Sequence, residues 1–216
     1  MVQNAPLGRK LIAPPGYPWI IGSGAAGSLA WLLGWSLLAW MGFLGAVFFL
    51  FFFRDPERAI PADDAAIVAP ADGKVIIVDE VADEDLGPAR RVAVFMNVFD
   101  VHVNRSPAAA SVVASEHHRG RFLLAFREDA DKANERQVTV LATGDGRRLK
   151  VVQIAGLVAR RIICPLKPGD RLERGQRIGM ICFGSRVDLY LPPNCSIMVK
   201  VGDRVKAGAS IVGKWE

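Results

Sequence analysis

Two places in the chain carry residue types that can transfer protons or attack a carbonyl. The first is the segment Asp100–Asn104, in which polar residues alternate with valine. Residues two apart on a strand share a face, so the pattern predicts Asp100, His102 and Asn104 on one face and the valines on the other. A histidine has an ordinary pKa of about 6.5 and therefore transfers protons near neutral pH. We expect His102 to act as a general acid or base; the alternative is a structural histidine hydrogen-bonded at a strand end.

The second place is Gly184-Ser185, directly before the alternating segment Arg186–Leu191. Glycine has no side chain, so its carbonyl can be approached closely and its backbone can hold a strained conformation. A serine hydroxyl becomes a nucleophile when a base lies beside it. Taken alone, however, a Gly-Ser pair before an alternating segment is most often a turn that enters a strand.

Four sequence blocks give these residues a context. They are 52–58, 69–75, 99–105 and 183–186, which contain the Arg-Asp-Pro-Glu-Arg, Pro-Ala-Asp-Gly, Asp-Val-His-Val-Asn-Arg and Phe-Gly-Ser-Arg sequences. In this order and at this spacing they resemble the phosphatidylserine decarboxylases of the short bacterial and archaeal type. The resemblance covers most of residues 52–195.

The resemblance implies a self-processing enzyme, a carboxy-lyase. Ser185 would attack the carbonyl of Gly184, and β-elimination would split the chain into residues 1–184 and 185–216. A pyruvoyl group would remain at residue 185 as a covalent cofactor made from Ser185. It would form a Schiff base with phosphatidylserine and accept the electrons released with CO₂, so that phosphatidylethanolamine results and no external cofactor is needed.

The same resemblance implies further site residues. Asp72 aligns with an aspartate that orients the histidine of self-cleavage, although Asp-Gly is also a common hairpin turn. Asn134 and Arg136 match a block near the substrate, where Arg136 would meet the phosphate or carboxylate. The long bacterial relatives carry a second histidine where this chain has Arg105, so which step His102 serves stays open.

Charge and cysteine usage argue against several other classes of protein. The chain has 27 basic and 22 acidic residues, a balance without any Lys/Arg run, which argues against a nucleic-acid-binding protein. Its cysteines, Cys164, Cys182 and Cys195, are odd in number and lack C-x-x-C spacing, which argues against a disulfide framework or a zinc site. We expect small buried thiols in a reducing compartment, and no metal.

From residue 66 onward, short β-branched segments alternate with turn dipeptides, which predicts a mostly β domain. The expected strands are Lys74–Val78, Arg91–Met96, Gln137–Ala142, Lys150–Gln153, Arg161–Cys164 and Val187–Leu191. No β-α-β alternation is visible, so a parallel doubly wound sheet is not expected.

An internal repeat refines this fold. Lys167–Leu172 is echoed 33 residues later by Lys200–Val205, and each copy is followed by a glycine and an isoleucine at matching spacing. The repeat resembles the β-hammerhead of biotinyl and lipoyl domains and predicts a β-sandwich or hammerhead-like domain. A carrier domain with a modified lysine at Lys200 is the alternative, but that lysine lies at the start of a repeat unit rather than in a hairpin turn.

The N-terminal part is strongly apolar. No charged residue lies between Lys10 and Arg54, and a single membrane-spanning helix needs only about 20 apolar residues. Glycines near the middle predict two short helices, roughly 17–33 and 36–53, that form a hairpin. This stretch is too long for the apolar core of a signal peptide.

We therefore divide the chain into a membrane-anchoring segment, residues 1–53, and a decarboxylase domain, residues 54–216. Basic residues flank both ends of the hairpin, which predicts that the domain lies on the cytoplasmic side of the cell membrane. A segment that lies in the interface without crossing is the alternative. The expected partners are phosphatidylserine with the surrounding lipid and the two cleavage fragments as a heterodimer; a homo-oligomer stays open.

Two other functions stay open at this point. One is a pyruvoyl-dependent decarboxylase of a soluble amino acid, against which the apolar N-terminus argues. The other is a non-catalytic, membrane-anchored hammerhead adaptor, in which Gly184-Ser185 is only a turn. A denaturing gel separates the enzyme classes from the adaptor, because only the enzymes give two fragments.

Overall fold

The computed structural model describes residues 11–121, 133–156, 161–182 and 184–216, which divide into two compact units, residues 11–57 and 58–216. The first unit contains a short 3₁₀ helix, η1 (Pro14–Gly16), and the helices α1 (Tyr17–Leu32) and α2 (Ser36–Phe52). The predicted pair of helices is therefore confirmed. They are joined at Gly34, whose φ of 78° suits the tight connection.

Small residues allow α1 and α2 to pack closely. A Cβ atom on Gly42 would lie only 2.5 Å from the Cα of Gly27, so the two backbones are nearly in contact. The four tryptophans of this unit are each more than half exposed, at 54–59%. Within the described part of the chain, no helix is both long and apolar enough to cross a membrane. Membrane anchoring stays a prediction.

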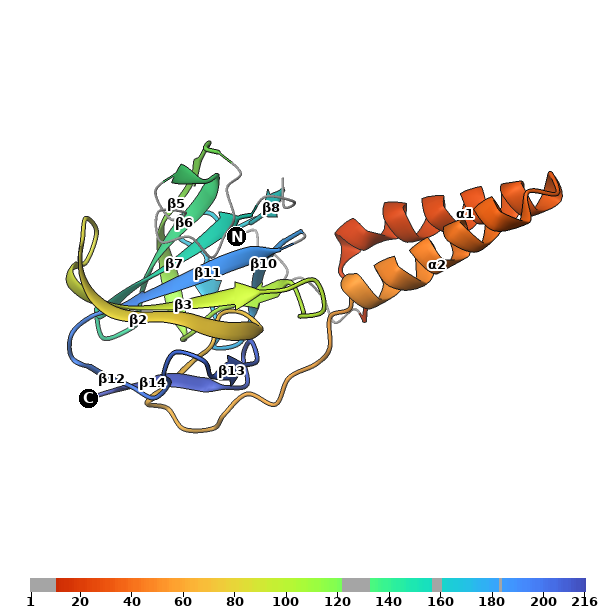
Figure 1. Cartoon of the computed structure of the whole chain (residues 1–216). Coiled ribbons are helices and arrows are strands. Elements are labelled where there is room, and N and C mark those ends of the chain that lie inside the picture. The colour runs from red at the N-terminus through yellow and green to blue at the C-terminus, as the bar shows by residue number, and fades with distance from the viewer. Residues whose placement is uncertain (1–10, 122–132, 157–160, 183) are drawn as a thin grey trace. The chain divides into compact units, whose positions relative to one another are not determined.

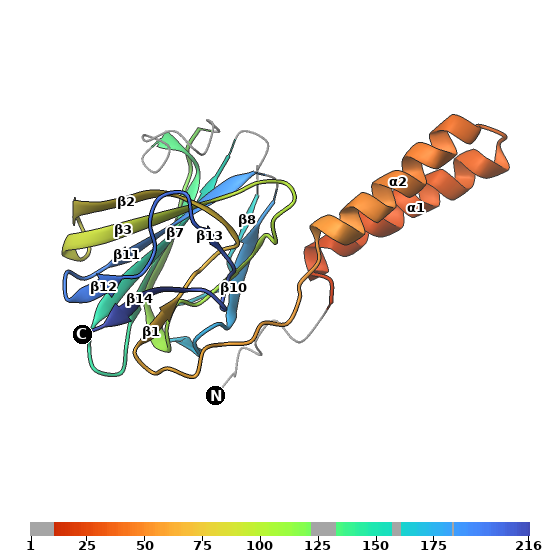
Figure 2. The ribbon, with the colours of Figure 1, turned by 60° about the horizontal axis from the view of Figure 1, so that its bottom comes forward.

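The second unit is built of strands (Figures 1 and 2). The described strands are β1 (Ala66–Val68), β2 (Gly73–Asp83), β3 (Gly87–Met96), β4 (Val103–Arg105), β5 (Ala110–His118), β6 (Arg136–Ala142), β7 (Arg148–Ala155), β8 (Ile162–Ile163), β9 (Arg171–Leu172), β10 (Arg177–Ile181), β11 (Ser185–Leu191), β12 (Cys195–Ile197), β13 (Arg204–Val205) and β14 (Ile211–Trp215). The predicted mostly β class is confirmed, and all six predicted strands correspond to strands of this set.

The order of the strands in the sheets has an internal two-fold symmetry. The large sheet runs β13-β2-β3-β11-β7-β6-β5-β9, and the two small sheets run β1-β14-β12 and β4-β10-β8. Equating β1–β3 with β4–β6, and β11–β14 with β7–β10, maps each sheet onto itself or onto the other small sheet. The domain therefore consists of two equivalent halves related by an approximate two-fold axis between β7 and β11.

Register and turn geometry support this equivalence. The β2–β3 ladder shifts between Val75 and Ile77, and the β5–β6 ladder shifts between Val112 and Ala114, the corresponding residues. In the sequence repeat, Gly202 N donates to Val75 O at 2.9 Å, and Gly169 N donates to Val112 O at 2.8 Å. The predicted hammerhead repeat thus forms the two turns that close the large sheet at its ends.

The main core lies on the inner face of the large sheet, against the small sheets (Figure 2). Along β11, side chains alternate between the two faces. Val187, Leu189 and Leu191 belong to this core, whereas Tyr190 packs into a separate cluster with Val152 and Ile154. Ser185, at the start of β11, therefore points its side chain toward the main core.

Candidate active site

Ser185 begins the central strand β11, whose residues are all buried. It lies opposite Met96 of β3 on one side and Ala155 of β7 on the other. Gly184, directly before it, has a φ of 65°, a conformation that glycine adopts without steric cost. The predicted turn into a strand is present, and it delivers the serine into the interior of the domain; Phe183 lies outside the described residues.

The hydroxyl of Ser185 is in an unusual state for a buried polar group. Its Oγ is fully buried and has no hydrogen-bond partner among the residues that the structure describes. An unsatisfied buried polar group costs about 1–3 kcal/mol and is uncommon in folded proteins. The buried hydroxyl next to the Gly184–Ser185 peptide bond therefore agrees with the predicted nucleophile, a role that stays a prediction.

Two charged residues of β11, Arg186 and Asp188, form an ion pair on the face of the strand opposite Ser185. Arg186 Nε and Nη2 each donate to the carboxylate of Asp188 at 2.6 Å, and both side chains are completely buried. Removal of one partner of a buried pair costs about 3–5 kcal/mol, so each charge needs the other for β11 to stay buried. Sequence analysis missed this pair, although its signal, opposite charges two apart on a strand, was present.

His102 lies directly before the short strand β4. Its Nδ1 is 3.0 Å from the carbonyl oxygen of Asp100, and its own carbonyl accepts from Ile181 N at 3.3 Å. The second contact places His102 beside the end of β10, four residues before Ser185 in the chain. Because a carbonyl only accepts, the first contact requires the proton on Nδ1, and the lone pair of the neutral ring then lies on Nε2.

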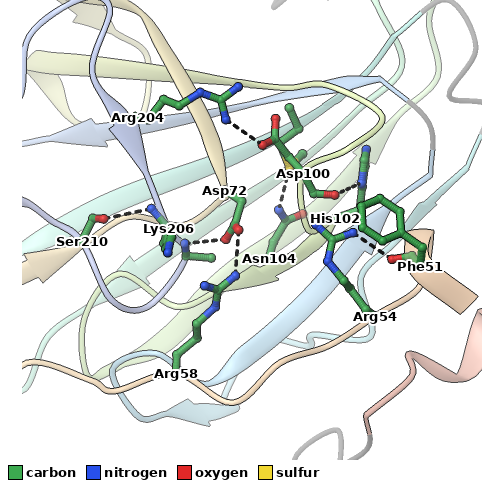
Figure 3. A network of polar contacts seen from close by, with 12 residues as sticks. Phe51, Arg54, Arg58, Asp72, Asp100, His102, Asn104, Arg204, Lys206 and Ser210 are labelled. Carbon is green, nitrogen blue, oxygen red and sulfur yellow. Dashed lines mark hydrogen bonds and ion pairs between the residues drawn. The ribbon is translucent and has the colours of Figure 1, made fainter.

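The prediction that Asp100, His102 and Asn104 share one strand face is wrong, because the strand begins only at Val103. Residues 97–100 form a turn instead, in which Asn97 N donates to Asp100 Oδ2 at 2.9 Å and Asp100 N donates to Asn97 O at 3.0 Å. Asn and Asp side chains compete in this way with extended backbone pairing. Asp100 also accepts from Arg204 at 3.2 Å, which ties the turn to the second repeat (Figure 3).

Asp72 is buried at the start of β2 and bound on both oxygens (Figure 3). Oδ2 accepts from Arg58 Nη2 at 2.7 Å, and Oδ1 accepts from Ala207 N at 2.8 Å. Burial raises the pKa of the Asp72 carboxyl above its usual value, although the Ala207 amide and Arg58 oppose the shift. These contacts tie Asp72 to the segment before β1 and to the turn after β13. Its predicted role in orienting His102 stays a prediction.

The structure separates the two predicted substrate-binding residues. Asn134 is buried, and its Nδ2 donates at 2.8 Å to the carbonyl oxygen of Ala155, the residue paired with Ser185. Arg136 is paired with Ile154, which is paired with Arg186, so its side chain leaves from the face opposite Ser185. There it lines a cavity of about 620 Å³. Asn134 thus lies near Ser185, and a role of either residue in substrate binding stays a prediction.

Comparison with known proteins gives this arrangement its family. The sequence profile of the phosphatidylserine decarboxylases matches residues 46–213. The chain belongs to the phosphatidylserine decarboxylase family. Among its relatives, the phosphatidylserine decarboxylase proenzyme of Gluconacetobacter diazotrophicus is 44% identical over 99% of both chains. Those of Symbiobacterium thermophilum and Citrifermentans bemidjiense are 44% and 46% identical, over 95% and 94% of this chain and 96% and 95% of their own.

The family confirms the resemblance on which the sequence analysis relied, and with it the enzyme class, a carboxy-lyase. The relatives are named proenzymes, a term for proteins that are processed before they act. Within the part of the chain that the structure describes, no group of three or more His, Cys, Asp and Glu residues is placed to hold a metal ion.

Proposed function

We propose that this protein decarboxylates phosphatidylserine to phosphatidylethanolamine at the cell membrane, after it has cut itself between Gly184 and Ser185. The observation that carries the proposal is the buried hydroxyl of Ser185, which has no hydrogen-bond partner among the described residues and follows a glycine with positive φ. Membership of the phosphatidylserine decarboxylase family supports the substrate and the reaction.

The residues at the cut suit formation of a pyruvoyl group. Ser185 Oγ attacks the Gly184 carbonyl carbon, the C–N bond breaks, and the acyl group passes from nitrogen to oxygen. Loss of a proton from Cα of residue 185 then expels the carboxylate of Gly184, and hydrolysis of the resulting enamine releases ammonia. Once formed, a pyruvoyl group would supply a carbonyl that condenses with the substrate amine and accepts the electron pair of the breaking C–CO₂ bond.

The fold supports a stable complex of the two fragments. Residues 185–216 contribute β11, which is paired on both sides by strands of the other fragment, β3 and β7. The side chains of Val187, Leu189 and Leu191 are buried in the core. Separation would expose this apolar surface and break two ladders, so the fragments 1–184 and 185–216 remain together as a heterodimer.

His102 is the residue that we assign to proton transfer. With Nδ1 bound to the Asp100 carbonyl, a neutral ring accepts a proton at Nε2. This suits either removal of the Ser185 proton during self-cleavage or donation of a proton to the substrate carbon after loss of CO₂. The same ring can serve both steps in turn, since the second begins only after the first is complete.

The apolar helices α1 and α2 support a location at the cell membrane. Many of their tryptophan and leucine side chains are exposed within the helical unit, as in segments that lie in a membrane. The lipid substrate is also found in the membrane. We infer that residues 1–53 hold the catalytic domain at the cytoplasmic surface. Membranes washed at high salt should retain the protein, because the attachment is apolar rather than ionic. Recovery of the full chain in the soluble fraction would contradict this part of the proposal.

The test of self-cleavage compares wild-type protein with Ser185→Ala. Wild type should give two fragments on a denaturing gel, and intact-mass measurement should find a pyruvoyl-blocked fragment that begins at residue 185. Ser185→Ala should stay uncut and release no CO₂ from phosphatidylserine. A wild-type chain that stays intact, or a C-terminal fragment with a free serine amino group, would refute the proposal.

A further inference from the structure

Two buried amide side chains lie behind Ser185. Gln153 Nε2 donates to Asn104 Oδ1 at 2.8 Å, and both residues are at most 1% exposed. Asn104 Nδ2 in turn lies 3.7 Å from the sulfur of Met96, the residue opposite Ser185 on β3. These side chains link β4, β7 and β3 around the start of β11.

Within this group of linked side chains, one atom lacks a hydrogen-bond partner. Gln153 Oε1 is buried and accepts no hydrogen bond within the described residues, as Ser185 Oγ has none. Gln153 lies two residues before Ala155, which is paired with Ser185, so Gln153 and Ser185 are diagonal neighbours on the same face of the sheet. Such neighbours are about 7–8 Å apart, within reach of a long side chain. An acceptor and a donor, both unsatisfied and not bonded to each other, therefore lie at diagonal positions on the same face of the sheet.

The two-fold axis relates this site to an equivalent one at Gly146-Arg147, which has no amide pair. Asn104 is paired with Gly179, and a Cβ on Gly179 would lie 3.2 Å from Gln153 Nε2. In the other half Ile67 is paired with Gly213, and a Cβ on Gly213 would lie 3.4 Å from Leu191 Cδ1 and 3.6 Å from Ile67 Cδ1. The amides Asn104 and Gln153 thus correspond to the aliphatic residues Ile67 and Leu191.

The equivalent site also lacks the serine. Strand β7 corresponds to β11, and the residues that correspond to Gly184-Ser185 are Gly146-Arg147. Gly146 has a φ of 83°, so the turn is kept. The buried amide pair is therefore present at the site that contains the serine, whereas the equivalent site at Gly146-Arg147 has two aliphatic side chains in its place.

We propose that Gln153 and Asn104 are positioning residues for self-cleavage. In the conformation that cuts, a rotation of the Ser185 side chain lets Gln153 Oε1 accept a hydrogen bond from Ser185 Oγ–H, while Asn104 holds the Gln153 amide in place. The bond selects the rotamer of Ser185 in which a lone pair of Oγ faces the Gly184 carbonyl. Neither amide removes the proton, which passes to the base. The inference rests on the proposed self-cleavage at Gly184-Ser185.

Two single variants separate this role from a structural one. Gln153→Glu keeps an acceptor oxygen at the right distance but buries a carboxyl group, whereas Gln153→Met keeps the size and removes the acceptor. We expect Gln153→Met to be the more stable protein and Gln153→Glu to cut itself faster. Gln153→Met should be slower than wild type by at least about 10-fold, which corresponds to about 1.4 kcal/mol. A structural role would make the cutting rate follow stability.

The double variant Asn104→Leu/Gln153→Leu copies the aliphatic pair of the other half. Replacement of both partners by apolar groups of similar shape is often neutral for folding, so we expect a melting temperature close to that of wild type together with slow cutting. Leu191→Met is the matched control in the other half and should cut at the wild-type rate. Arg147→Ser places a serine after Gly146 and should give no second cut, since no amide pair supports it.

The rates are measured as fragment yield against time after cell-free synthesis, and the melting temperatures on the full chain. Cutting at the wild-type rate by the double variant, or a Gln153→Met rate equal to or above that of Gln153→Glu, would overturn the positioning role while leaving self-cleavage intact. A wild-type chain that stays uncut would instead overturn the proposed function.

Discussion

The two equivalent glycine turns allow the backbone at the cut to be tested against an internal control. Gly184 and Gly146 have φ values of 65° and 83°, and a Cβ on either would meet no atom within 4 Å. Substitution by alanine therefore adds no clash at either position and leaves only the cost of positive φ, about 1–2 kcal/mol. Each variant should lose this amount of unfolding free energy, or about 2–8 °C in melting temperature for a domain of this size.

The rate of self-cleavage should distinguish the two variants. In Gly184→Ala, the same 1–2 kcal/mol disfavours the conformation that presents the carbonyl to Ser185, so cutting should slow by about 5- to 30-fold. Gly146→Ala should cut at the wild-type rate, because its turn takes no part in the reaction. Fragment yield is followed on denaturing gels after cell-free synthesis, and melting temperatures are measured by circular dichroism.

Two results would refute this reasoning. Equal slowing in both variants would show that cutting follows the stability of the whole domain rather than the geometry at Gly184. An unchanged cutting rate in Gly184→Ala, together with the expected loss of stability, would show that the positive φ of Gly184 belongs to the fold alone.

Three further predictions follow from single side chains. His102→Ala should slow either self-cleavage or, with cleavage intact, decarboxylation, by about 10²–10⁴-fold. Comparison of the fragment yield with the CO₂ released per pyruvoyl group shows which step is affected. Rates within a few-fold of wild type would show that His102 is structural. Burial raises the pKa of Asp72 in the folded protein, so the stability that its neutral form contributes is present below the ordinary pKa of about 3.9 and is lost as pH rises through the raised value. Wild type should therefore lose stability relative to Asp72→Asn as pH rises through that window in chemical unfolding experiments, and a constant difference would contradict the shift. Burial raises the pKa of the Cys195 thiol to about 11. At pH 8, iodoacetamide should therefore modify Cys195 only in the unfolded protein. Detection of alkylated Cys195 by peptide mass spectrometry after treatment of the folded protein would count against this burial.

Much of the fold could be predicted because its signals are local. The uncharged stretch and Gly34 predicted α1 and α2, and short β-branched segments between turn dipeptides predicted the strands. The repeat at Lys167–Leu172 and Lys200–Val205 predicted the hammerhead turns. The Gly184-Ser185 pair was found from the four sequence blocks that resemble the phosphatidylserine decarboxylases, since the pair taken alone predicts only a turn into a strand.

The rest of the site could not be predicted because it depends on long-range contacts and on competition between side chains and backbone. Asn104 and Gln153 are 49 residues apart and meet only when β4 packs against the large sheet. The predicted strand at Asp100 is replaced by a turn because the side chains of Asn97 and Asp100 bind local amides. Equivalence of β1–β3 with β4–β6 leaves no clear trace in the sequence, since many residue types suit a given position in a strand.

The equivalence also separates what the fold requires from what the reaction requires. Ile181 N donates to His102 O in one half, and Trp215 N donates to Ala65 O in the other at 2.9 Å, so the backbone is repeated while the histidine is not. Positive φ occurs at both glycine turns, so backbone conformation alone does not explain a cut confined to one of them. The equivalent site at Gly146-Arg147 lacks counterparts of Ser185, His102 and the amide pair, so these side chains differ between the two sites together. We infer that they act together, and that transfer of the serine alone to the equivalent site, at position 147, would not transfer the reaction.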